Sequence, residues 1–290
     1  MNLTVTFESA ELQFMQILEE FFVSVYDEKS LASHGIEHHR RVWNFAKEIV
    51  VLFSEQNLIS DPTIVFRLII ACYLHDIGMS VDPGIRHGHH SKDLCIRFLD
   101  NNLLDKSNYQ DVLLAIENHD NKEYKTSAVN NDLLTILSVA DDLDALGFLG
   151  IYRYSEIYLT RGINPGEIGH LIRENASKRF ENFVKIFGFS EEFVRKHQKR
   201  YEILDNFFSE YSNQVVTYKF GTGHPVGYCG VIELLIDTIN NRFILDDVCD
   251  QPKKYSPDPI AIWFFKELLF ESISKNTKVI TKLHKGNSET

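Results

Sequence analysis

The longest strongly apolar stretch of the chain runs from Ile64 to Leu74, where Arg67 is the only charged residue. Pro62 suits the first turn of a helix and Gly78 is a typical stop signal, so this stretch predicts one helix. A helix that is hydrophobic on all sides has no face left for water. We therefore expect this helix to run through the middle of a helical bundle.

Apolar side chains also recur every three or four positions elsewhere, which is the pattern of amphipathic helices. The pattern predicts helices over residues 9–26, around 42–53, 94–99 and 112–116, over 133–147 and 151–161, and then over 171–187, 190–211, 231–241 and from 261 onward. The stretch 133–147 is the second strongly apolar one. No internal repeat or low-complexity block interrupts this succession of helices.

Two polar residues, His75 and Asp76, close the central apolar helix. Burying an imidazole and a carboxylate is costly unless each finds a strong partner, and a metal cation can satisfy both at once. In a chain with 12 histidines the pair alone carries little information, because a lone buried histidine is more often bonded to a carbonyl group. Further residues of the same types in similar places would make a metal site the better explanation.

Such residues do recur on apolar helix faces and at helix ends. They are His38 one turn before Val42, His89 and His90 at a helix entrance, His119 just after Ile116, and Asp141 one turn after Leu137. Asp144 lies one turn further and can orient a ligand or bind substrate, whereas we expect Asp142 to be solvated. The simple alternative for the histidines at 87–90 is a solvated cluster. Mixed histidine and carboxylate ligation favours Mn, Fe, Co, Ni or Zn over Ca.

Composition and charge restrict the class of protein. The 290 residues are 44% hydrophobic and carry a formal net charge of -11, which argues against a broad nucleic-acid-binding surface. The four cysteines are widely spaced without a CxxC pair, so we expect reduced thiols and a cytoplasmic location. The N-terminal segment lacks a basic region, and no apolar run is long enough to span a bilayer, so we expect neither secretion nor membrane insertion.

Three segments together resemble the HD-domain superfamily of metal-dependent phosphohydrolases. Its H…HD…D pattern is matched, in order and with family-type flanking residues, by 38–46, 74–78 and 140–147. The resemblance covers roughly residues 33–158 and implies an all-α HD-domain bundle with metal between the helices. No GYP signature follows the HD pair, so cyclic-di-GMP hydrolysis is not indicated.

The same resemblance implies roles for individual residues. Family members with extra histidines between the HD pair and the final aspartate bind two metal ions. Asp76 would bridge them, with one ion held by His38, His75 and Asp141 and the other by His119 and either His89 or His90, of which we favour His90. We expect Asp76, His119 and Asp144 to act in catalysis. The cofactor would be one or two divalent transition metal ions, with Mg as a further option.

The second half of the chain predicts a helical extension. Arg153 and Arg161 are candidate phosphate clamps, although arginines of this kind are more often surface ion-pair partners. The glycine-rich segment 219–230 lacks a nucleotide-binding fingerprint and is interpreted as a turn. We expect an HD core over 1–160, a helical extension over 161–250, and a last apolar helix with a polar tail over 251–290. That helix packs back on the bundle or forms a contact between subunits of a homo-oligomer.

These observations favour a phosphohydrolase that cleaves a phosphate ester of a nucleotide or another small phosphorylated metabolite. The HD-domain resemblance leaves two alternatives. One is a di-iron HD-fold oxygenase, and the other is a non-catalytic nucleotide-sensing HD module. The fold alone does not decide among them.

Overall fold

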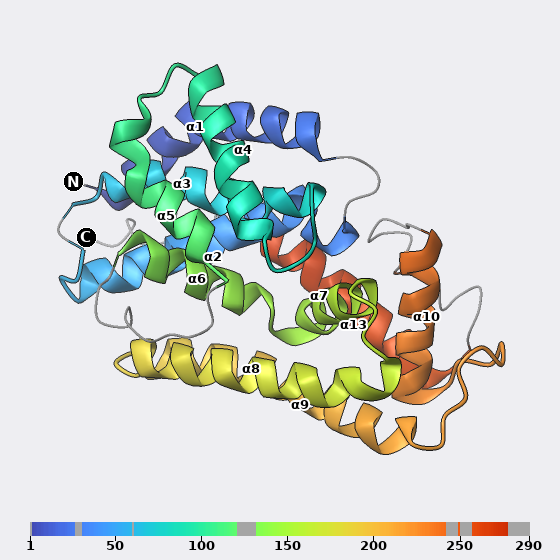
Figure 1. Cartoon of the computed structure of the whole chain (residues 1–290). Helices are drawn as coiled ribbons and strands as arrows, with labels where there is room; N and C mark the ends of the chain where they lie inside the picture. The colour runs from blue at the N-terminus through green and yellow to red at the C-terminus, as the bar shows by residue number, and fades with distance from the viewer. Residues whose placement is uncertain are drawn as a thin grey trace. The chain divides into compact units, whose positions relative to one another are not determined.

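A computed structural model describes residues 2–26, 31–59, 61–120, 132–241, 249 and 257–277. The described part is all-α and contains no strand, which confirms the expected fold class (Figure 1). None of its helices has the length and apolar character needed to cross a membrane. Within the stretch 251–290, where the last helix and the polar tail are expected, residues 251–256 and 278–290 lie outside the described residues.

The chain forms two compact units. The first comprises Met1–Asp144 with Arg179–Val194, and the second comprises Ala145–Lys178 with Arg195–Thr290. Helices α8 (Pro165–Phe187) and α9 (Glu191–Val215) therefore each contribute residues to both units. The three regions expected over 1–160, 161–250 and 251–290 stay a prediction.

The first unit is a bundle around α3. Its longer helices are α1 (Leu3–Val25), α2 (Ile36–Glu55), α3 (Ile64–Leu74), α4 (His87–Asn101), α5 (Gln110–Asn118) and α6 (Leu133–Asp144). Every residue of α3 from Leu68 to Leu74 is fully buried, and α3 contacts α1, α2, α5 and α6. The apolar stretch is thus the central helix that its composition predicts.

Side chains cap two of these helices. Asn2 accepts a hydrogen bond from the Thr4 backbone N–H at the start of α1, at 3.0 Å. Asp132 accepts one from the Thr135 N–H at the start of α6, at 2.8 Å. Such caps satisfy N–H groups that have no partner within the helix, and so they define where α1 and α6 begin.

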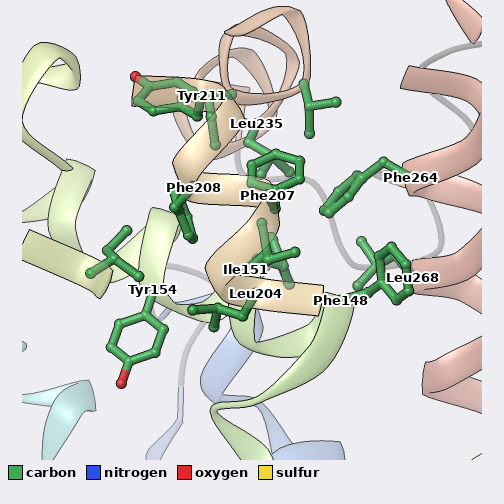
Figure 2. Packing of buried hydrophobic residues seen from close by; sticks show 14 of the residues in the cluster. Phe148, Ile151, Tyr154, Leu204, Phe207, Phe208, Tyr211, Leu235, Phe264 and Leu268 are labelled. Atoms are coloured by element: carbon green, nitrogen blue, oxygen red, sulfur yellow. The ribbon is translucent and has the colours of Figure 1, made fainter. Parts of the chain in front are cut away.

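The second unit has its own hydrophobic core, built by α7 (Gly147–Thr160), α10 (Gly227–Asn241), α13 (Pro259–Thr277) and its parts of α8 and α9. Figure 2 shows Phe207 of α9 facing Phe264 of α13, with ring centroids 5.3 Å apart. Residues 219–226 of the glycine-rich segment form turns, bends and irregular backbone, residues 227–230 begin α10, and the Gly221 N–H donates to Glu233 Oε1 at 3.0 Å. This segment is therefore a turn held by α10, and not a strand-to-helix phosphate loop.

Candidate metal centre

Five segments of the first unit bring histidine and aspartate side chains together. The segments are the first turn of α2, the end of α3, the start of α4, the residue after α5 and the last part of α6. Each side chain belongs to a residue that exposes 5% of its surface or less, and the residues are His38, His75, Asp76, His87, His119 and Asp141. Side chains of this polarity are rarely so deeply buried without strong partners.

Asp76 lies at the centre of this group. Its Oδ2 atom lies 3.4 Å from His38 Nε2 and 3.4 Å from His75 Nε2. Its Oδ1 atom lies 3.4 Å from His87 Nε2 and 2.9 Å from His119 Nε2. At distances of 3.4 Å or less, the two oxygens therefore face two different pairs of histidines, which would let this one carboxylate serve two metal ions.

Two overlapping sets of side chains can each hold a metal ion. The first is His38, His75, Asp76 and Asp141, and the second is Asp76, His87 and His119; within each set the ligand atoms lie within 4.8 Å of one another. In the first set, Asp141 Oδ1 lies 3.7 Å from the Nε2 atoms of both His38 and His75. Asp76 is the residue that the two sets share.

All four histidines are oriented through their second ring nitrogen. Each donates its Nδ1 hydrogen to an oxygen outside the centre: His38 to Asp144 Oδ2 at 2.9 Å, His75 to the Cys72 carbonyl at 3.0 Å, His87 to the Gly84 carbonyl at 2.8 Å and His119 to the Ile116 carbonyl at 2.7 Å. A metal-binding histidine has one ring nitrogen that does not bind the metal. The hydrogen on that nitrogen is typically donated to a nearby oxygen, as it is here. The Nε2 atoms are therefore the ones directed at Asp76.

The Nε2 atoms of His38 and His75 lie only 3.2 Å apart. Because both Nδ1 atoms keep their hydrogens for Asp144 and the Cys72 carbonyl, the neutral rings present two lone pairs to each other. Two facing lone pairs repel unless a proton or a metal cation lies between them. The chemistry of this pair fits a metal ion, and the adjacent oxygens of Asp76 and Asp141 would complete its ligands.

The charges in the centre are strongly coupled. Burial alone would raise the pKa of Asp76, but His75 and the hydrogen bond from His119 outweigh it and hold that pKa well below its usual range. Burial lowers the pKa of His75. For His119, burial is outweighed by the hydrogen bond and charge of Asp76, which raise its pKa to about 9. The carboxylate is thus ionised and ready to bind cations over the whole physiological range.

Asp144 lies behind His38. It accepts the His38 hydrogen bond through Oδ2, and its Oδ1 atom accepts from Arg41 Nε at 2.8 Å. Both oxygens are fully buried. We expected Asp144 either to orient a ligand or to bind substrate. Its position fits the first role, because its hydrogen bond to His38 Nδ1 fixes the tautomer of the His38 ring.

Comparison with known protein families gives a match over most of the chain. A family model described as HD-CE matches residues 19–217, which is more than half of the chain. The chain belongs to the HD-CE family. The match, with the buried histidine and aspartate cluster, confirms the resemblance to HD-type metal-binding domains. Comparisons with curated proteins and with solved structures gave no match.

In this HD-CE chain the structure places a different histidine of the 87–90 cluster beside Asp76 from the one that we favoured. His87 is buried and faces Asp76, whereas the His89 side chain is 58% exposed and pairs with Glu117 and Asp93. His90 is half-buried and belongs to neither metal-binding set. The helical period could have indicated this, since His87 lies seven, eight and eleven residues before Leu94, Cys95 and Phe98 and so shares their buried face.

Substitutions of His87 and His89 in this HD-CE chain should separate the two assignments. We expect His87→Ala to lower the metal content from two ions per chain to one, because the second set loses one of its three side chains. His89→Ala is the matched control and should leave the content unchanged, since that side chain is exposed. Elemental analysis of protein purified without chelator measures both. Loss of metal only in His89→Ala would contradict the placement.

Three other residues discussed from the sequence, Arg153, Arg161 and Asp142, belong to neither metal-binding set of this HD-CE chain. Arg153 is buried within α7 and Arg161 is exposed at its end, and both belong to the second unit, so their role as phosphate clamps stays a prediction. Asp142 was expected in solvent, but it is buried and paired with Arg179. His34, one turn before His38, is fully buried, and its Nε2 atom lies 3.8 Å from Asp76 Oδ2.

Proposed function

We propose that this chain is a metal-dependent phosphohydrolase that cleaves a phosphate ester of a nucleotide or another small phosphorylated metabolite. The observation that carries the proposal is the position of Asp76, whose two oxygens face two different pairs of histidine Nε2 atoms. Paired metal ions that share a carboxylate are typical of enzymes that hydrolyse phosphate esters. Membership of the HD-CE family agrees with a centre of this kind.

The ligand set supports transition metals. His38, His75, Asp76 and Asp141 would hold one ion, and Asp76, His87 and His119 the other. Mixed imidazole and carboxylate donors suit Mn, Fe, Co, Ni or Zn. When bound, such ions lower the pKa of water and polarise a phosphoryl oxygen. The second set has three side chains against four in the first, which leaves the second ion more positions for water or substrate.

The side chains around the centre would orient the ligand atoms and supply the negative charge that binds the ions. Asp144 and the Cys72 carbonyl keep a hydrogen on the Nδ1 atoms of His38 and His75, so their Nε2 atoms remain available as ligands. Asp76 carries a full negative charge because its pKa is held far below neutrality. The burial of all these groups raises the strength of each charge interaction above its value in water.

Metal affinity should depend on pH through His119. Its Nε2 hydrogen, which is donated to Asp76, must leave before this nitrogen can bind a metal ion. Because its pKa is raised to about 9, we expect the affinity of the second set to increase by about tenfold per pH unit from neutral pH until it levels off near pH 9. Isothermal titration at several pH values measures this slope. An affinity that is flat between pH 7 and 9 would contradict it.

The same raised pKa has an opposite effect on stability in protein treated with chelator. The His119 imidazolium, paired with Asp76, stabilises the fold fully below the ordinary histidine pKa. That contribution is lost as the pH rises through about 9. Asp76 does not titrate in this window, because its own pKa is far lower.

Metal content and reaction should be tested on the same preparation. We expect about two transition metal ions per chain and release of inorganic phosphate from at least one compound in a panel of nucleotides and small phosphate esters. Iron together with oxygen consumption would instead favour the oxygenase. Bound metal with tight nucleotide binding and no hydrolysis would favour the sensing module. Absence of metal after Mn and Fe are supplied would contradict all metal-dependent functions.

A further inference from the structure

Arg179 contacts the metal centre from outside. It lies on α8, in the part of that helix that belongs to the first unit, and its side chain is only 11% exposed. Its Nη1 atom donates to Asp142 Oδ1 at 2.5 Å and lies 3.6 Å from Asp141 Oδ2. Its Nη2 atom lies 3.5 Å from Asp120 Oδ1. One guanidinium is thus surrounded by three carboxylates, and one of these belongs to the first metal-binding set.

The two oxygens of Asp141 face different partners. Oδ1 faces the Nε2 atoms of His38 and His75, whereas Oδ2 faces Arg179. A carboxylate whose outer oxygen is attracted by a fixed positive charge cannot rotate freely about its Cβ–Cγ bond. Its inner oxygen therefore stays directed at the space between the two histidines.

Asp142 in turn fixes the guanidinium. The Arg179–Asp142 contact is short, and both side chains are almost completely buried, so it is a strong charge-assisted hydrogen bond. The planar guanidinium can reach Asp142 and Asp141 through one nitrogen while its second nitrogen reaches toward Asp120. An ammonium group is a single point charge and lacks this fork.

We propose that Arg179 is a positioning residue for the metal centre, which holds Asp141 in its ligand orientation, and that Asp142 positions Arg179. The proposal rests on the metal site of the proposed function, but it does not depend on which reaction that site performs. It also assigns a role to a residue that lies 32 positions after the last family motif, at 140–147, and whose place in the chain gave no hint of a link to the site. Residue 179 lies within the segment matched by the family model.

The test compares Mn²⁺ binding by the wild-type chain and by Arg179→Gln. Titration calorimetry measures the affinity of each site, and electron paramagnetic resonance reports the surroundings of the bound Mn²⁺. Loss of a partner that orients a ligand typically weakens metal binding about 10- to 100-fold. We expect that loss at one of the two sites, with the affinity of the other site retained and with an altered resonance of the remaining Mn²⁺. Arg173→Gln is the matched control, since Arg173 lies on the same helix and pairs with Asp205 through a 40% exposed side chain. It should bind as the wild type does.

Two further variants test the same role of Arg179 if Arg179→Gln fails to fold. Asp142→Asn keeps the side-chain shape but weakens the anchor, and it should weaken the same single site by a smaller factor. Arg179→Lys keeps the charge and should restore part of the affinity. A site-selective loss in these variants supports the proposal, because a merely structural role would affect both sites together.

The outcomes are distinct from those of the proposed function. One outcome is that the wild type binds two ions while the Arg179 and Asp142 variants bind both with affinities within about twofold of the wild type. That change is well below the roughly 10-fold minimum expected, so the positioning role would be wrong while the metal site stands. If the variants lose both sites equally along with helical structure, Arg179 is a structural ion pair only. If the wild type itself binds no metal, the proposed function fails first.

Discussion

Asp76→Asn is expected to abolish metal binding at both sets of ligands and hydrolysis with it. Asp76 is the residue that the two sets share, and each of its oxygens faces its own pair of histidines. Asn has nearly the same shape but no charge, and its NH₂ group would point a donor at one of the pairs. The loss should therefore exceed the roughly 10- to 100-fold effect of removing a partner that only orients a ligand. Elemental analysis and phosphate release measure the two effects on the same preparation.

A matched control for Asp76→Asn comes from the loop that follows. Asp82 accepts a hydrogen bond from the Gly84 backbone N–H at 2.8 Å and belongs to neither metal-binding set, so Asp82→Asn should keep metal and activity. Circular dichroism would show that the helices of both variants persist. An Asp76→Asn protein that keeps two ions and the wild-type rate would remove the basis of the proposed centre.

Local sequence patterns were sufficient to predict the helical bundle and most of the side chains that meet in the candidate metal centre. The uniformly apolar run of α3 predicted its central place, because such a helix can be stable only where every face is covered. The helical period also put His38 and Asp141 on buried stripes, and the structure brings both to the end of α3. In these cases a single helix and its own period carried enough information.

The features that the sequence did not indicate depend on contacts between distant segments. From the sequence Asp142 was expected to be solvated within α6, and its ion pair with Arg179, 37 positions later on α8, helps to make its burial favourable. His87 shares the period of the buried residues of α4, but that period applies to it only because α4 begins at residue 87, and a helix start is defined by capping and packing more than by period. Likewise, the division into two units passes through α8 and α9, where no change of composition marks it.

Gly78 is a further case in which a distant contact explains a residue. Its sequence position suggests a helix stop, yet the structure gives it another task, because α4 packs directly on it. A Cβ atom built at Gly78 would lie 2.2 Å from the His87 carbonyl oxygen and 2.4 Å from the Ser91 backbone nitrogen. The Gly78 N–H also donates to Ser91 Oγ at 2.8 Å. The absence of a side chain is what lets the start of α4, and His87 with it, reach Asp76.

Gly78→Ala is therefore expected to lower the free energy of unfolding and to displace His87 at the same time. Overpacking a core typically costs about 1–3 kcal/mol, and the cost here should lie at or above the upper end, since the atoms in the way belong to the backbone and cannot rotate aside. Thermal unfolding should show a Tm lower by about 2–4 °C per kcal/mol. Metal analysis should show the second ion lost in the fraction that remains folded, because movement of α4 withdraws His87 Nε2 from Asp76 Oδ1.

Gly35→Ala separates this effect from the general cost of replacing a glycine. The nearest atom to a Cβ at Gly35 is the Ala32 carbonyl oxygen at 3.5 Å, an ordinary contact, and the backbone there has a φ of -67° that alanine adopts readily. We expect this variant to unfold within about 1 kcal/mol of the wild type and to keep both metal ions. The opposite result would be a Gly78→Ala protein with the same stability and metal content as Gly35→Ala. In that case α4 could move without leaving Asp76, and the position of His87 would not depend on the close approach at Gly78.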